Sequence, residues 1–339
     1  MEKEGLWTTV VGSWPLSNTE DNMKRIFEDL INIGIDYPCY PQLVPMISQF
    51  LSPLAEIVPE LEEIDNRFYL SNDFKVPQKL ITLKYGKFIK DFFINHPHLL
   101  DCIKGTKACL TGPLTLATEI VLKGEIAKGI KPRIFTEPRA IMIDSVVEKF
   151  AELMKQIGKA YNDMGIEIIS MDEPILGFLV GRKVLFHSKD FILRILNKSI
   201  SEITSLSSIH VCGIISPYLR DLLLQSNAKI LDHEFSTNEQ NFEVFQKTHF
   251  QGTDKYLALG TVESKFVKSN NKNINDYVES VEYLKNYLKK AIKQYGKENL
   301  VIKPDCGFFP LKDSFGEKDG YGIALRKVKN MVLALKDLK

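Results

Sequence analysis

The chain has 339 residues, 44% of them hydrophobic and 26% charged, as in a soluble globular protein with one large domain or two ordinary ones. Its net charge of +1 gives no strong field for nucleic acid or for an anionic membrane surface, and no apolar run reaches the length of a membrane span. The charged N-terminus lacks the apolar core of a secretory signal, so we expect a cytoplasmic protein with neither a nucleic-acid nor a membrane partner. Five widely spaced cysteines argue against a disulfide framework and leave thiols free for metal binding or chemistry.

Short β-rich apolar runs alternate with longer helical patterns along the whole chain. We expect strands over 8–12, 35–40, 107–111, 166–171, 207–211, 229–232, 256–259 and 300–303. We expect helices over 18–33, 78–95, 138–164, 190–205, 216–225, 275–295 and 324–338. This alternation predicts an α/β fold, a (β/α)8 TIM barrel that occupies residues 1–339 as one domain, with an elaborated helical excursion over 43–74 after the second strand. A doubly wound sheet is the alternative, but no glycine-rich dinucleotide loop follows a strand.

Polar side chains gather where the expected strands end. In such barrels the reactive residues lie at the C-terminal ends of the strands, so these side chains are the candidates for a functional site. They are Gly12, Ser13, Gln42, Asp172, Glu173, His210, Cys212, Glu234, Glu263, Lys265, Asp305 and Cys306.

Four of these residues have the chemistry of a zinc site. His210 and Cys212 are two positions apart at the end of an apolar run, so a strand would place both side chains on one face. Glu234 and Cys306 each follow a later strand, and imidazole, thiolate and carboxylate all suit zinc. For the first pair alone, a buried cysteine and a core histidine would be the simpler interpretation. A carboxylate among the ligands favours a catalytic centre, because it can leave and open a position for substrate.

Two further motifs predict contacts with a substrate. Asp172 follows an apolar strand and could hold an ammonium group, although a helix N-cap or a salt bridge would also explain it. Gly12 permits close approach of the backbone to a ligand, and the N–H groups beyond it could bind a carboxylate. An ordinary tight turn is the alternative for Gly12 and Ser13.

With these motifs the chain resembles the C-terminal catalytic barrel of cobalamin-independent methionine synthase. The matching stretches are TTVVGSWP from Thr8, LTGP from Leu110, MDEP from Met171, HVC from His210 and PDCG from Pro304. The resemblance implies a barrel that binds Zn²⁺ and homocysteine and methylates the homocysteine sulfur. Residue by residue, the resemblance implies that the zinc ligands are His210, Cys212, Glu234 and Cys306. It implies that Asp172 is the carboxylate that binds the substrate amino group, and that Gly12 with Ser13 form the turn that binds the substrate carboxylate.

Three positions depart from the family pattern, and all concern the methyl donor. The family has a glutamate where this chain has Gln42, a histidine acid where it has Lys265, and a folate-stacking tryptophan where it has Glu119. Folate-using members also carry an N-terminal barrel that this sequence lacks. The resemblance is therefore to the short, single-barrel form. It implies a methylcobamide, carried by a corrinoid protein, as donor in place of methyl-tetrahydrofolate. Gln42 is then expected in substrate binding, and Glu234, Asp172 and Lys265 in catalysis.

Two other functions stay open at this point. One is a zinc-dependent methyltransferase acting on another thiol such as coenzyme M. Asp172 argues against it, because a sulfonate thiol has no ammonium group to bind. The other is a non-catalytic, zinc-stabilised barrel that binds a corrinoid protein.

Overall fold

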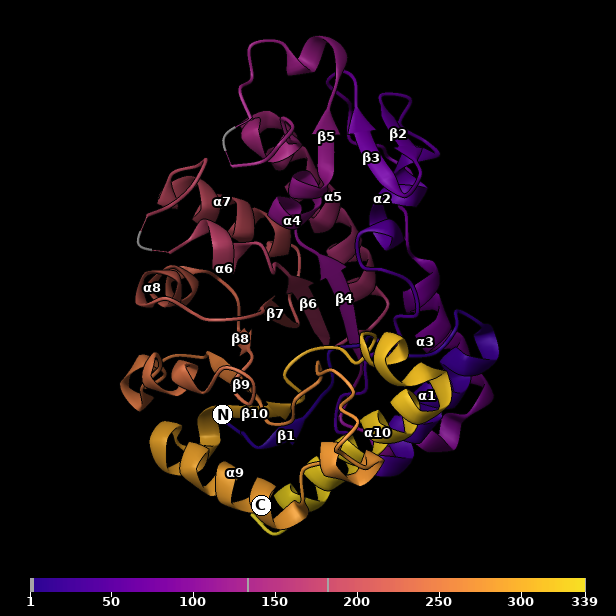
Figure 1. The fold of residues 1–339 in the computed structure, drawn as a ribbon, viewed down its shortest axis with the longest axis vertical. Coiled ribbons are helices and arrows are strands. Elements are labelled where there is room, and N and C mark those ends of the chain that lie inside the picture. Colours follow the sequence, from indigo (N-terminus) through magenta and orange to yellow (C-terminus); the bar gives the residue numbers. More distant parts are fainter. Residues whose placement is uncertain (1–2, 133, 182, 339) are drawn as a thin grey trace.

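Seven parallel strands form one curved sheet in the order β1-β10-β9-β8-β7-β6-β4, which Figure 1 shows at the centre of the molecule. The computed structural model describes residues 3–132, 134–181 and 183–338. The strands are β1 (Trp7–Thr8), β4 (Lys107–Thr111), β6 (Ile168–Asp172), β7 (Leu206–Val211), β8 (Ile230–His233), β9 (Tyr256–Gly260) and β10 (Leu300–Lys303). Six of them lie within two residues of the expected runs, because each is buried and rich in apolar residues. The exception is β1, which covers Trp7–Thr8 instead of 8–12; beyond it the pairing continues as isolated bridges at Thr9 and Ser13.

The segment 37–42 closes the barrel between β1 and β4. Parallel bridges join Thr9 to Tyr37 on one side and Cys39 to Lys107 on the other. Pro38 interrupts this segment and has no N–H to donate, so a continuous ladder cannot form there. The expected second strand is therefore present as isolated bridges, and the predicted eightfold barrel is confirmed.

Helices surround the barrel, as Figure 1 shows. They are α1 (Glu20–Ile33), α3 (Lys84–Asn95), α4 (Pro113–Glu119), α5 (Asp144–Asp163), α6 (Leu176–Leu179), α7 (Lys189–Ile200), α8 (Pro217–Gln225), α9 (Val281–Tyr295) and α10 (Leu311–Lys336). The expected helix over 138–164 begins only at Asp144, because Pro138 and Arg139 pair with the backbone of β5 (Ile120–Leu122) instead. The closing helix is longer than expected and is broken at Gly316, whose φ is +74°. No described helix is long and apolar enough to cross a membrane.

The excursion over 43–74 contains β structure that the sequence analysis did not predict. It begins with the helix α2 (Ser48–Ala55) and continues as a hairpin of β2 (Leu61–Ile64) and β3 (Arg67–Leu70). β5 completes a separate three-stranded sheet, which projects from the barrel in Figure 1. The hairpin turn is Asp65-Asn66, with φ of +50° and +60°, a conformation that these two residue types tolerate well. The expectation of a helical excursion was therefore incomplete.

The barrel interior changes character along its axis. A small apolar cluster fills the end where the strands begin, and it consists of Trp7, Ile168, Ile230, Ala258 and Val301. Side chains two positions further along a strand lie on the same face, one layer closer to the strand ends. In this second layer the buried residues are polar or small: Ser170, Asp232, Gly260 and Lys303. The polar layer lies directly beneath the candidate site.

Candidate functional site

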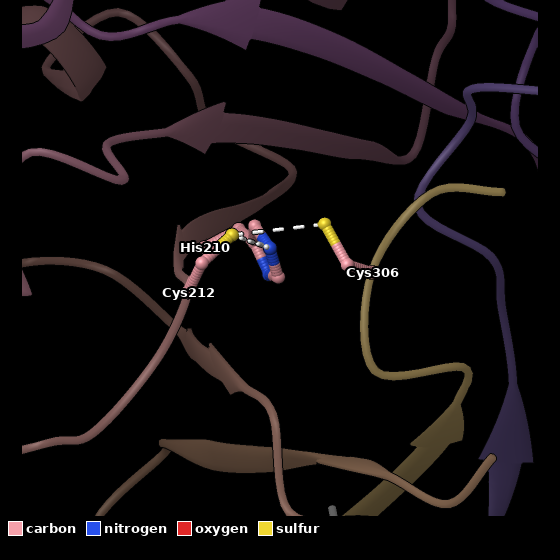
Figure 2. Close-up of side chains that lie close together, drawn as sticks. All are labelled: His210, Cys212 and Cys306. Carbon is pink, nitrogen blue, oxygen red and sulfur yellow. Dashed lines mark hydrogen bonds between the residues drawn. The ribbon is translucent and has the colours of Figure 1, made fainter. Parts of the chain in front are cut away.

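Three of the four expected zinc ligands converge at the C-terminal end of the barrel. His210 Nε2 lies 3.1 Å from Cys212 Sγ, which lies 3.6 Å from Cys306 Sγ. All three ligand atoms lie within 4.8 Å of one another. Figure 2 shows His210 and Cys212, at the end of β7, facing Cys306 on the loop after β10. One metal ion could therefore contact all three side chains.

Local structure explains why these side chains meet. His210 lies on the inner face of β7, and Gly213, with φ of +81°, turns the chain directly after Cys212. Cys306 follows β10, and its N–H donates to Ser264 Oγ at 3.0 Å. Parallel neighbouring strands end at the same edge of a sheet, so residues distant in sequence gather there.

His210 is oriented by a buried carboxylate. Its Nδ1 lies 2.7 Å from Asp232 Oδ1. Burial opposes the charge of Asp232, yet Lys303 and His210 hold the pKa of this carboxyl well below its usual range. Burial likewise opposes protonation of His210, but the Asp232 carboxylate raises its pKa to about 10. With the Nδ1 proton held by Asp232, Nε2 is the nitrogen left to bind a metal ion, and binding would displace its proton.

The two thiols have opposite electrostatic surroundings. A hydrogen bond from Cys212 and the positive charge of His210 lower the pKa of Cys306 well below its usual range, although burial opposes this. The hydrogen bond with Cys306 and burial raise the pKa of Cys212. Two sulfur ligands and an oriented imidazole fit a zinc ion.

Glu234, the expected fourth ligand, lies at the edge of this group. Its carboxylate accepts hydrogen bonds from the Gly213 N–H at 2.9 Å and from Asn238 Nδ2 at 2.7 Å. Its charge contributes to raising the pKa of Cys212, so the carboxylate is within electrostatic range of the sulfur atoms. The carboxylate is thus held beside the three ligands by neutral hydrogen-bond donors, and its role as a ligand stays a prediction.

The two acidic residues at the end of β6, Asp172 within the strand and Glu173 directly after it, have separate surroundings. Asp172 is buried on the inner face, where burial raises its pKa to about 6, and Ser170 Oγ donates to it at 3.2 Å. Glu173 accepts the N–H groups of Leu114 and Thr115, both at 2.9 Å, and so caps the helix α4. The capping alternative therefore applies to Glu173, while Asp172 keeps its carboxylate at the barrel mouth.

Gly12 and Ser13 lie beside the loop that carries Cys306. The φ of Gly12 is +122°, a conformation that side chains disfavour. The Phe308 N–H donates to the Ser13 carbonyl at 2.8 Å, and a Cβ at Gly307 would lie 1.8 Å from Ser13 Oγ. The predicted carboxylate-binding turn is thus packed against the metal-binding loop.

Gln42 is buried at the end of the closing segment 37–42. Its backbone bridges to Ser13, and its Nε2 donates to Gln49 Oε1 at 2.7 Å. Gln49 in turn donates to the Tyr40 hydroxyl at 2.7 Å. The Gln42 side chain is therefore anchored next to the expected substrate turn, and its contact with substrate stays a prediction.

Lys265 is the expected site residue that the structure does not bring to the ligands. Its side chain is exposed, and none of the described contacts links it to the metal-binding group. Its neighbour Ser264 is buried and contacts Cys306 instead. The loop after β9 thus buries Ser264 and exposes Lys265, and the catalytic role of Lys265 stays a prediction. Glu119 is also exposed, at the end of α4.

Two charged residues that support the candidate ligands were not predicted from the sequence. Asp232 and Lys303 are both buried on the inner face, and Lys303 Nζ lies 2.5 Å from Asp232 Oδ1. A signal for Asp232 was available, since it lies two positions before Glu234 and so shares its face. No comparable signal marked Lys303, because a lysine that ends an apolar run is ordinarily solvated.

Comparison with known proteins gives a consistent family. The family model of the cobalamin-independent synthase catalytic domain matches residues 105–336. The chain is 30% identical to the methionine synthase of Methanothermobacter thermautotrophicus over 69% of its own length and 64% of that relative. It is 27% identical to the methionine synthase of Methanocaldococcus jannaschii over 98% of its own length and 99% of that relative.

Solved structures show the same fold. A B12-independent methionine synthase from Shewanella sp. W3-18-1, in complex with selenomethionine, superimposes with a TM-score of 0.67 at 16% identity, with 98% of each chain covered. A methyltransferase from Methanosarcina mazei gives a TM-score of 0.60 at 16% identity, covering 94% of this chain and 86% of that one. With the family model matched over most of the barrel, the chain belongs to the cobalamin-independent methionine synthase family.

Proposed function

We propose that this protein methylates the thiol sulfur of L-homocysteine to form methionine, at a zinc ion held by His210, Cys212, Glu234 and Cys306. Family membership and the relatives named methionine synthase support this assignment. The observation that carries it is the group of one imidazole and two thiols, with ligand atoms within 4.8 Å, at the barrel mouth. A free thiol with a pKa of about 8.5 is mostly protonated at neutral pH, and a bound zinc ion would stabilise the thiolate form of the substrate.

The residues around this group suit an amino-acid thiol. Asp172 presents a buried carboxylate to the substrate ammonium, and the Ser13 N–H, directly after Gly12, presents a donor to the substrate carboxylate; the next N–H, that of Trp14, already donates to the Gln42 carbonyl at 3.3 Å. The Glu234 carboxylate accepts hydrogen bonds from the Gly213 N–H and Asn238 Nδ2. These donors would still stabilise its negative charge if the substrate sulfur took its place beside the other ligands. In the reaction a sulfur–methyl bond forms as the donor's bond to methyl breaks, and the thiol proton passes to solvent.

A methylcobamide, delivered by a corrinoid protein, is the donor that we propose. Methyl-tetrahydrofolate needs its leaving nitrogen protonated, which calls for a positioned acid. Lys265, where the family has a histidine acid, is exposed, and Ser264 takes the inward position. When a methylcobamide gives up its methyl group, the cob(I)amide leaves with the electron pair of the cobalt–methyl bond and accepts no proton, so the lack of an acid at this position does not hinder this transfer.

The test combines metal analysis with a two-donor assay. The purified protein should contain one zinc ion per chain and form methionine from homocysteine and methylcobalamin, but not from methyl-tetrahydrofolate. Efficient turnover with the folate would overturn the donor, and faster methylation of coenzyme M than of homocysteine would overturn the substrate. Stoichiometric zinc without transfer to any thiol would favour the non-catalytic barrel.

A further inference from the structure

Lys303 is a fully buried cation that contacts the residue supporting His210 and the residue preceding Cys306. Its Nζ lies 2.5 Å from Asp232 Oδ1 and donates to the Asp305 carbonyl at 2.7 Å. Asp232 holds the Nδ1 of His210, and Asp305 directly precedes Cys306. One ammonium group thus connects the support of the imidazole with the backbone that presents a thiol.

A second link joins the same two loops. The Asp305 carboxylate accepts three successive N–H groups, those of Phe235 at 2.9 Å, Ser236 at 2.9 Å and Thr237 at 2.6 Å. These groups begin one residue after the expected fourth ligand, so the turn that carries it is held by the residue before Cys306. A Cβ at Gly260 would lie 2.0 Å from Asp305 Oδ1, so only glycine leaves room for this carboxylate.

Stability alone is a weak explanation for a charge at this place. The interior of such barrels is ordinarily filled by branched apolar side chains, and replacing a buried ion pair by apolar residues is often neutral or stabilising. Lys107 already lies 3.8 Å from the other oxygen of Asp232. A second lysine on the same carboxylate, with its remaining contact on the backbone beside Cys306, is better explained by a need for orientation.

We propose that Lys303 is a positioning residue of the metal centre. It holds Asp232 in the orientation that engages Nδ1 of His210 and leaves Nε2 for the metal ion, and it fixes the backbone before Cys306. Groups that orient metal ligands in this way have effects of about 10- to 100-fold on metal affinity. The proposal rests on the metal centre of the proposed function but not on methyl transfer.

The test is zinc affinity, measured by competition with a chromophoric chelator. Lys303→Met keeps an unbranched apolar side chain and removes the ammonium group, and we expect zinc binding about 10-fold weaker or more. Lys327→Met is the matched control, because Lys327 is also buried and paired with a carboxylate, that of Glu279 at 2.8 Å. The control should lose stability to urea and keep the zinc affinity of the wild type.

A second pair of variants covers the case in which Lys303→Met leaves Asp232 uncompensated and fails to fold. They are the single variant Asp232→Asn and the double variant Asp232→Asn with Lys303→Met, and neither contains a carboxylate at position 232. We expect both to bind zinc more weakly, and the double variant to lose much less than the product of the two single effects, because the residues act in series. The cobalt-substituted forms should show an altered ligand-field spectrum.

Two outcomes would overturn the proposal. One is a folded Lys303→Met protein that binds zinc as tightly as the wild type. The other is a double variant with wild-type affinity and an unchanged cobalt spectrum. Both differ from failure of the proposed function itself, which would show as a wild-type protein that binds no zinc at all.

Discussion

The barrel contains two cysteine pairs at the same separation but in different surroundings. The Sγ atoms of Cys212 and Cys306 lie 3.6 Å apart, and so do those of Cys39 and Cys109. The first pair is half-buried at the strand ends beside His210, whereas the second is fully buried, with Cys39 in the closing segment 37–42 and Cys109 on β4. Among the described residues only the first pair has a third ligand within reach of one metal ion.

The comparison of the two pairs shows that a short distance between two thiols is not sufficient for a metal site. The hydrogen bond with Cys39 and burial raise the pKa of Cys109 well above its usual range, and its thiol donates to the Val11 carbonyl at 3.0 Å. Cys306 is the opposite case, because Cys212 and the charge of His210 lower its pKa. The charge of His210 and a third ligand atom make the first pair a candidate metal site, while the second pair consists of ordinary buried core residues.

The largest effect should come from exchanging one sulfur for oxygen in each pair. Cys306→Ser should weaken zinc binding by more than about 100-fold, beyond the effect of losing a supporting group, and abolish methyl transfer while the barrel still folds. Cys109→Ser is the matched control and should keep one zinc ion per chain. Metal analysis after dialysis, with circular dichroism for folding, checks both. Equal zinc loss in the two variants would remove the distinction between the pairs.

A smaller effect should follow from the carboxylate that acts on both pairs. The negative charge of Asp172 contributes to raising the pKa of Cys109 and of Cys212. If this charge binds the substrate ammonium, Asp172→Asn should raise KM for homocysteine by about 30-fold, equivalent to about 2 kcal/mol for a charge-assisted hydrogen bond, and leave zinc bound. Steady-state kinetics measure the change.

The control for this prediction lies in the substrate. The wild-type protein should discriminate strongly against 4-mercaptobutanoate, which is homocysteine without its amino group, and Asp172→Asn should lose most of that discrimination. A variant that still prefers homocysteine by the wild-type factor would show that Asp172 does not bind the ammonium group.

The smallest effect should come from the buried pair. Cys109→Ala removes a packed sulfur atom and leaves a small cavity beside Cys39 and Gly12, so we expect about 1–2 kcal/mol less stability. Urea denaturation measures this change. Zinc content and KM should be those of the wild type, and loss of zinc from this variant would mean that the buried pair contributes to the metal centre.

The strands and the three converging ligands were predictable because both follow from short-range pattern. An apolar run such as 300–303 is a buried strand in any α/β fold, and β10 occupies these four residues. The two-residue spacing of His210 and Cys212 places both at one face of a strand end. The rule that barrel sites lie at the C-terminal strand ends then brought Cys306 into the same group.

Errors arose where a residue's partner lies elsewhere in the chain. Pro138 is a good first residue for a helix, but its backbone pairs with β5, so the helix begins later. Lys265 and Ser264 differ by one position, and the path of the loop, which sequence pattern does not give, buries Ser264 and exposes Lys265; the role of Lys265 stays a prediction. The hairpin of β2 and β3 depends on β5 for its third strand, and β5 lies about fifty residues further along the chain.

Local pattern was enough for the order of elements, the barrel and the chemistry of its ligands, because hydrophobic periodicity and ligand type are properties of neighbouring residues. Closure of the barrel decided the rest. It buried Lys303 against Asp232, placed Asp305 under the turn after Glu234, and kept one pair of thiols from a third ligand. The contacts of Lys303 and Asp305 join residues about 70 positions apart, and their energies depend on burial, which no local stretch of sequence contains.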